Sequence, residues 1–201
     1  MKKITTAELN SEKNASFVAY FTRVMKPWEN NGSLTDEQRA TEVPAILLLN
    51  RWDGRVGFAG GNVDAGETLL QSAARESLEE INNVVSEDEL TAICSHNFQA
   101  GKQTLSTHLF AKEVSVDELM SIQQNVHTSR DFGDEITGTV LCLVGDFGRG
   151  KGFPNFLKSP MATSVKEELI ELISTQELVS NSSLEEMCNT AGLSSSELLF
   201  R

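Results

Sequence analysis

A glycine-rich loop followed by a helix with clustered carboxylates constrains this sequence more than any other feature. Six residue types stand at fixed spacing: Gly61, Glu67, Arg75, Glu76, Glu79 and Glu80. At 100° per residue, the last three share one face of a helix that the pattern predicts over 68–81. The expected apolar stripe lies roughly opposite and comprises Leu70, Ala74, Ser77, Leu78 and Ile81. The full spacing is improbable by chance, whereas a bare Glu-Glu pair would indicate only a surface helix.

Three carboxylates crowded on one helical face repel one another, and a divalent cation among them removes the repulsion. Their hard oxygen atoms favour Mg²⁺ or Mn²⁺. Such a cation can bind two phosphate oxygens of a diphosphate and activate a water for attack on phosphorus. Gly60 and Gly61 let the backbone approach metal and phosphate closely. Glu67 and Arg75 lie about two helical turns apart, so an ion pair between them would lock the loop to the helix.

The rest of the chain predicts a mixed sheet with helices on both faces, and hence an α/β fold. Strands are expected over 17–24, 43–50, 90–98, 104–112 and 136–143. Further helices are expected over 116–124 and 164–174, and Asp53-Gly54 predicts a hairpin turn. We therefore expect one main domain over residues 1–174, followed by an appended helical hairpin over 175–201.

The appended segment is predicted to form two short helices around Gly192, between residues 183 and 199. This arrangement resembles a helix-turn-helix. A DNA-reading helix needs basic side chains, whereas Glu185, Glu186 and Glu197 are acidic, which argues against DNA binding. Packing or self-association of the hairpin is the favoured interpretation, because its leucines need burial.

Charge and composition exclude several classes of protein. The net charge of −12, from 29 acidic and 17 basic residues, argues against a global electrostatic grip on nucleic acid. Arg149, Lys151, Lys158 and Lys166 form either a local basic patch or a solvated loop. The longest wholly apolar run, 45–49, is too short to cross a membrane, and the N-terminus lacks a secretory signal. The three cysteines are scattered and predict no disulfide framework, which indicates a cytoplasmic protein.

The spacing of the six loop and helix residues resembles the Nudix box, G-x5-E-x7-R-E-U-x-E-E-x-G-U, where U is a bulky aliphatic residue. Three positions depart from the box: Ser77 and Asn83 replace aliphatic residues, and Asn82 replaces the closing glycine. Asparagine is the next-best residue for a left-handed helix cap, so the turn can still form. The resemblance implies the Nudix fold, an α/β/α sandwich with a mixed β-sheet, and hydrolysis of a diphosphate linkage.

Segments outside the box are similar to the snoRNA-decapping Nudix enzymes of animals, which also hydrolyse inosine diphosphates. The similar segments are 45–58, 108–112, 131–135 and 152–157. Ala59 stands where that group has proline. The similarity covers roughly residues 17–172, and it also implies a homodimer.

This resemblance implies a role for each candidate residue. The metal ligands would be the Gly60 backbone, Glu76, Glu79, Glu80 and Glu135. Catalysis would fall to Glu79, Glu80 and Glu135. Substrate binding would fall to Arg51, Phe58 and Gly61, with the Phe58 ring stacking on a base. Glu67 and Arg75 would hold the motif together.

Several functions stay open at this point. The first is a Mg²⁺- or Mn²⁺-dependent hydrolase of an inosine-type nucleoside di- or triphosphate, which the acidic balance favours over long RNA. The second is the same chemistry on a nucleotide-capped RNA, held by the basic residues between 149 and 166. An ADP-ribose or NAD pyrophosphatase is an alternative within the same reaction class. A Nudix-fold module that binds a nucleotide without cleaving it is the alternative from another class.

Overall fold

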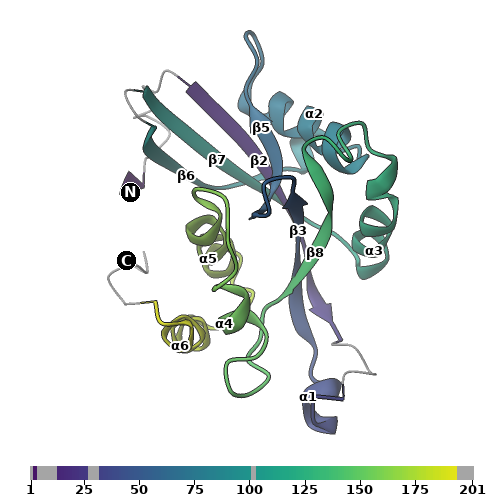
Figure 1. Ribbon diagram of the computed structural model, residues 1–201, viewed down its shortest axis with the longest axis vertical. Helices are drawn as coiled ribbons and strands as arrows, with labels where there is room; N and C mark the ends of the chain where they lie inside the picture. Colours follow the sequence, from purple (N-terminus) through teal and green to yellow (C-terminus); the bar gives the residue numbers. More distant parts are fainter. Residues whose placement is uncertain (1, 4–12, 27–31, 101–102, 194–201) are drawn as a thin grey trace.

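The computed structural model describes residues 2–3, 13–26, 32–100 and 103–193, and these build one sheet with helices packed on it (Figure 1). The strands are β1 (Lys2–Lys3), β2 (Lys13–Met25), β3 (Val43–Arg51), β4 (Val56–Gly57), β5 (Ala59–Asn62), β6 (Thr91–Ala100), β7 (Gln103–Glu113) and β8 (Ile136–Leu143). The α-helices are α1 (Asp36–Ala40), α2 (Leu69–Ile81), α3 (Val116–Asn125), α4 (Phe153–Phe156), α5 (Val165–Thr175) and α6 (Asn181–Ala191). Two 3₁₀ turns, η2 (Glu87–Glu89) and η3 (Val126–Thr128), complete the order.

Strand β2 is the centre of the sheet because it pairs along both of its edges. One edge runs parallel to β7, from Lys13 opposite Leu105 to Phe21 opposite Glu113. The other edge pairs antiparallel with β5 over residues 15–18 and then with β3 from Tyr20 onward. Strand β8 continues the sheet beyond β3, again antiparallel. The predicted mixed sheet is therefore confirmed, and β2 is what brings the glycine-rich β5 against the sheet.

Alternation along the central strands produces two apolar faces. On one face, Phe21 of β2 and Ile46 of β3 pack in a cluster with Leu169 and Leu172 of α5. On the other face, the neighbouring residues of the same strands pack with α2 and α3. That second cluster contains Val18, Tyr20, Ala45, Leu47, Ala73 and Leu119. Figure 1 shows α5 and α2 on opposite sides of the strands, so the expected α/β/α sandwich is confirmed.

Both ends of helix α2 are fixed by local hydrogen bonds. Thr68 caps the N-terminus, because its side chain accepts from Gln71 N while the Gln71 side chain accepts from Thr68 N. Asn82 ends the helix with φ 51° and ψ 37°, the left-handed conformation expected where the box has glycine. The Asn83 N–H then donates to the Ser77 carbonyl at 3.3 Å. The departure from the box at Asn82 is thus accommodated without loss of the turn.

The serine at the aliphatic position of the box is also accommodated. Ser77 is fully buried, as its place on the helix predicts. Its hydroxyl lies 2.6 Å from the Tyr20 hydroxyl and donates to the Asn83 carbonyl at 2.9 Å. A buried hydroxyl costs free energy only when it lacks such partners. The hydrogen bond to Tyr20 of β2 therefore lets a serine occupy the buried position where the box has an aliphatic residue.

The predicted buried face of α2 is wrong in one respect. Leu78, placed in the apolar stripe, is 46% exposed, whereas Ala73 and Glu80 are fully buried. The buried face of the helix includes Glu80, whose carboxylate accepts a hydrogen bond from the Gly60 N–H of β5. A hydrogen-bonded carboxylate can be buried at a position where apolar periodicity alone predicts exposure.

The described part of the tail packs on the main core. Leu184, Met187 and Cys188 of α6 are buried in the cluster that contains α5. The first tail helix is thereby confirmed; the second lies in 194–201, outside the described residues. The expected boundary between residues 174 and 175 stays a prediction.

The N-terminal arm and the membrane prediction complete the comparison. Lys2–Lys3 pairs antiparallel with β6, and 4–12 lies outside the described residues. In the described segments of the chain, no helix is both long and apolar enough to cross a membrane.

A buried carboxyl on α5 makes the stability of the fold depend on pH. Glu168 is 1% exposed and accepts from the Thr107 hydroxyl at 2.7 Å. Burial raises the pKa of Glu168 to about 7, although the hydrogen bonds from Thr107 and Ser164 lower it. The folded chain therefore holds this proton up to higher pH than the unfolded chain, and stability falls as pH rises from about 4.5 to 7.

We predict that Glu168→Gln removes this loss. Glutamine keeps the acceptor for Thr107 but carries no charge to desolvate. The variant should be more stable than the wild type at pH 8, by up to about 3 kcal/mol. The difference should shrink toward pH 4.5, where the carboxyl is protonated in both states. Urea denaturation at both pH values measures it, and an equal difference at both would contradict the buried, protonated carboxyl.

Candidate active site

Gly60 and Gly61 lie in strand β5, paired with β2, where the sequence predicts a glycine-rich loop. A Cβ on Gly60 would lie 2.2 Å from the Ser16 carbonyl oxygen of β2, and Gly60 has φ 150°. A Cβ on Gly61 would lie 2.6 Å from Oε1 of Glu76. The first glycine thus permits close strand pairing, and the second leaves room for a carboxylate beside the backbone.

Glu80 is the most deeply buried carboxylate of this loop and helix. Its Oε2 accepts from the Gly60 N–H at 2.7 Å. Its Oε1 is buried and has no hydrogen-bond partner among the residues that the structure describes. Burial raises the pKa of Glu80 to about 8; the charges of Glu76 and Glu135 raise it as well, and Arg51 lowers it. An orphaned carboxylate oxygen of this kind indicates a missing positive partner.

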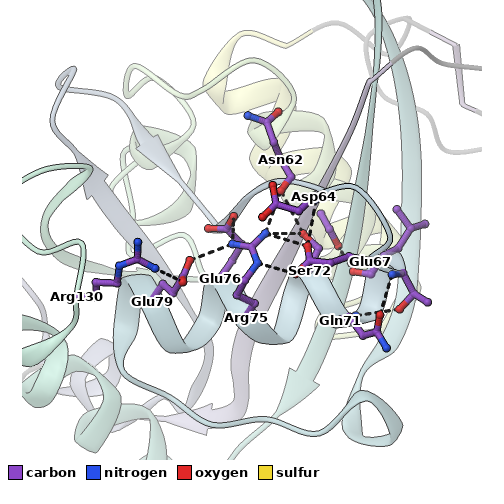
Figure 2. Close-up of polar contacts among 12 residues, drawn as sticks. Asn62, Asp64, Glu67, Gln71, Ser72, Arg75, Glu76, Glu79 and Arg130 are labelled. Atoms are coloured by element: carbon purple, nitrogen blue, oxygen red, sulfur yellow. Dashed lines mark hydrogen bonds and ion pairs between the residues drawn. The ribbon is translucent and has the colours of Figure 1, made fainter.

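Arg75 links the loop to the helix carboxylates (Figure 2). It pairs with Glu67 through two bonds, Nε to Oε1 at 2.8 Å and Nη2 to Oε2 at 3.1 Å. Its Nη1 also donates to Glu76 at 2.9 Å and to Glu79 at 3.0 Å. Nη2 reaches the Asn62 carbonyl at 3.1 Å. The predicted Glu67–Arg75 ion pair is therefore confirmed, and it is one part of a five-partner network that includes Ser72.

These charges shift the acid strengths of the network in opposite directions. The Arg75 hydrogen bond holds the pKa of Glu67 below its usual value. Burial raises the pKa of Glu76, and the nearby charges of Glu79 and Glu135 raise it further, while Arg75 lowers it. Glu67 is thus a stable anion that binds the Arg75 guanidinium. The surroundings of Glu76, in contrast, disfavour its ionised form.

A second loop, between η3 and β8, also contacts helix α2. Asp131 N donates to the Glu79 carbonyl at 3.1 Å, and the Arg130 guanidinium pairs with the Glu79 carboxylate. Figure 2 shows Arg130 and Arg75 approaching Glu79 from opposite sides. Glu135 ends the same loop and is exposed, yet its charge acts on both Glu76 and Glu80. The role of Glu135 as a further ligand or base stays a prediction.

The two predicted nucleotide contacts are placed differently. Arg51 is the last residue of β3. Its Nε is buried, has no hydrogen-bond partner among the described residues and lies 3.8 Å from Asp53 Oδ2. Its charge reaches Glu80, so it borders the carboxylates. Phe58 is 1% exposed and belongs to the core cluster beside α5. The ring is thus enclosed by core side chains and not open to a ligand. Its role in stacking on a base stays a prediction.

Sequence analysis missed Arg130. Arg130 directly precedes the 131–135 segment that the resemblance includes, so the sequence could have drawn attention to it. Its pairing with Glu79 could not be predicted, since the two residues are 51 positions apart in the chain. Of the basic residues between 149 and 166, Lys151 donates from Nζ to the Ser33 carbonyl at 3.2 Å. A basic patch formed by these residues stays a prediction.

The donor set suits a hard divalent cation. In the described part of the chain, no three acidic, histidine or cysteine side chains already stand in ligand geometry. Arg75 forms ion pairs with Glu76 and Glu79, and Arg130 forms one with Glu79. The Gly60 N–H donates a hydrogen bond to one oxygen of Glu80. The orphaned Glu80 Oε1 and the space that Gly61 leaves beside Glu76 fit such an ion. Oxygen donors of this kind favour Mg²⁺ or Mn²⁺ over softer metals.

Comparison with known proteins identifies the family. A model of the Nudt16-like family, described as U8 snoRNA-decapping enzyme-like, matches residues 30–179. The chain belongs to this Nudt16-like family. It is 38% identical over 120 residues to a U8 snoRNA-decapping enzyme of Homalodisca vitripennis, covering 58% of this chain and 63% of that protein.

A second relative of this Nudt16-like chain carries a different name. The chain is 31% identical over 143 residues to a Tudor-interacting repair regulator protein of Gallus gallus, covering 71% of this chain and 45% of that protein. The chain thus aligns with less than two thirds of either relative's length.

Solved structures agree with the family at the level of the fold. A MutT/nudix family protein from Enterococcus faecalis superposes with a TM-score of 0.56 at 13% identity. The superposition covers 95% of this chain and 71% of that one. This Nudt16-like chain therefore has the Nudix fold that its box predicts.

We predict that Gly61→Ala weakens Mn²⁺ binding while the fold persists. The added Cβ would meet the Glu76 carboxylate at 2.6 Å, and a flexible side chain can move aside. Displacing a ligand or its support typically costs about 10- to 100-fold in metal affinity. Mn²⁺ titration followed by electron paramagnetic resonance measures the affinity, and thermal denaturation checks the fold. An unchanged affinity would show that Glu76 does not bind the ion.

Proposed function

We propose that this chain is a Mg²⁺- or Mn²⁺-dependent hydrolase that cleaves a diphosphate linkage in an inosine-type nucleotide or a nucleotide-capped RNA. The observation that carries the proposal is the buried Glu80 oxygen without a partner, beside Glu76 and within reach of the Glu135 charge. Carboxylates so arranged are unfavourable unless positive charge joins them. Family membership supports the same chemistry.

The residues divide into those that hold the cation and those that shape the site. Glu76 and Glu80 would hold the ion, joined by Glu79, Glu135 and the Gly60 backbone. A bound cation would neutralise phosphate charge and make a water a better nucleophile. Glu67 is bound to Arg75 on the loop side and is left out of the ligand set.

The chain's own groups then serve the reaction as follows. Water attacks one phosphorus of the diphosphate, the bridging P–O bond breaks, and the leaving phosphate keeps the bridging oxygen. The proton of the attacking water passes to a carboxylate, for which exposed Glu135 is the best placed. Arg51 borders Glu80 and stabilises charge that develops on the phosphate oxygens. Gly61 keeps the backbone open to the substrate.

The names of the relatives support one substrate class and one different function. The U8 snoRNA-decapping relative supports a capped RNA. The second candidate function is a binding module that does not cleave its ligand. The name of the Tudor-interacting repair regulator relative supports it, because that name states an interaction and no reaction. The complete set Glu76, Glu79 and Glu80 favours the hydrolase over the module, because a module has no need for an orphaned buried carboxylate. The cytoplasmic location and the homodimer stay predictions.

We predict that Glu80→Gln abolishes turnover while the fold persists. Glutamine is isosteric and can still accept from Gly60 N–H, but it removes the charge that a cation needs. The assay measures phosphate and nucleotide release with Mg²⁺ or Mn²⁺ from inosine, guanosine and adenosine di- and triphosphates, ADP-ribose, NAD and a short capped RNA. A loss of at least about 100-fold is expected.

The matched control is Glu87→Gln, which changes an exposed carboxyl in the η2 turn. This variant should turn over substrate like the wild type. Full activity of Glu80→Gln would refute the assignment of the site. Cleavage of ADP-ribose or NAD alone would keep the reaction class and exclude the proposed substrates. Tight nucleotide binding by the wild type without any cleavage would establish the binding module.

A further inference from the structure

Two exposed aromatic rings flank the candidate active site. Trp52 is 66% exposed and Phe132 is 39% exposed, and the other large apolar side chains exposed among the described residues are aliphatic. Exposed single apolar residues are common, but a tryptophan that is two-thirds exposed forgoes much favourable burial. Neither ring belongs to a core cluster of the described structure.

The backbone holds both aromatic residues against the segment that carries Glu135. Trp52 N donates to the Glu135 carbonyl at 3.0 Å. Ile136, the next residue, pairs with Arg51 in the β3–β8 ladder and forms a bridge with Phe132. Both rings therefore project from segments that are bonded directly to the edge of the site, one from the β3–β4 turn and one from the 131–135 loop.

The charges around the rings are balanced rather than basic. Arg55 pairs with Asp53 at 2.6 Å, and Arg130, 71% exposed, pairs with Glu79 and with Asp131. Because the chain has a net charge of −12, attraction to phosphates cannot supply most of the affinity for a nucleic acid. Stacking of bases on aromatic side chains is largely independent of charge and tolerates any base sequence.

We propose that Trp52 and Phe132 form an aromatic platform that stacks unpaired bases of a single-stranded RNA beside the cleaved diphosphate. The inference rests on the proposed function, since it places the RNA chain next to the carboxylates of α2. A duplex cannot use the platform, because its bases are already stacked and paired. Binding should depend only weakly on salt, since Arg55 and Arg130 beside the rings are already paired with carboxylates.

Binding of an uncapped RNA tests the platform without requiring turnover. The probe is a labelled single-stranded oligoadenosine of eight nucleotides, followed by fluorescence anisotropy with the full chain. Removing both rings in Trp52→Ala/Phe132→Ala should raise Kd at least about tenfold, as expected for lost base stacking. Thermal denaturation checks that the variant is folded. The matched control is Val24→Ala, which should leave Kd unchanged. Val24 is an exposed apolar residue near the C-terminal end of β2.

A spectroscopic readout reports stacking itself. The chain has two tryptophans, so a Trp28→Phe background leaves Trp52 as the single emitter. Single-stranded RNA should quench its fluorescence, and a duplex of the same length should not.

The outcomes separate the platform from the proposed function. Unchanged Kd in the double variant, absence of quenching, or equal binding of duplex would overturn the platform. RNA binding that depends on both rings, in a protein that cleaves nothing, would support the platform while refuting the hydrolase. Cleavage of small nucleotides with no RNA binding would do the reverse.

Discussion

The two-bond ion pair between Arg75 and Glu67 is the interaction on which the site depends. It joins a loop that has little regular structure to a helix whose direction is fixed by the core. A charged pair at the surface contributes little to stability, but a partly buried, two-bond pair fixes geometry as well. The same guanidinium keeps Glu76 and Glu79 from repelling each other, so it organises the carboxylates as well as the loop.

Burial of Glu80 is the second constraint, and it works against stability. The carboxylate occupies a core position of α2, where only the Gly60 N–H compensates one oxygen. A protein selected for stability alone would place an apolar residue there. Local conflicts of this kind concentrate at functional sites, where the cost is offset by the packing of the rest of the domain. The two-faced sheet and the helices on each side supply that packing.

Short-range geometry explains what the sequence made predictable. The helix over 69–81, the left-handed Asn82 and the Glu67–Arg75 pair follow from helical spacing and from the conformations that single residues allow. The longer strands were predicted from runs of apolar, aromatic and β-branched residues, whereas β5 was expected to be part of a glycine-rich loop. The pairing of Arg130 with Glu79 was not, because it depends on how a distant loop folds back on α2. The exposure of Leu78 was missed for a similar reason: apolar periodicity cannot anticipate that Gly60 lies beneath Glu80 and draws that carboxylate inward.

The central claim is that Glu76 and Glu80 share a divalent cation. Crystals grown with Mn²⁺ and measured at the manganese absorption edge test it most directly, because anomalous scattering locates the ion independently of activity. We expect an anomalous peak in contact with carboxylate oxygens of both residues, with Arg75 still bound to Glu67. A structure without a peak at these residues, in which Glu80 keeps only its bond to Gly60, would contradict the account.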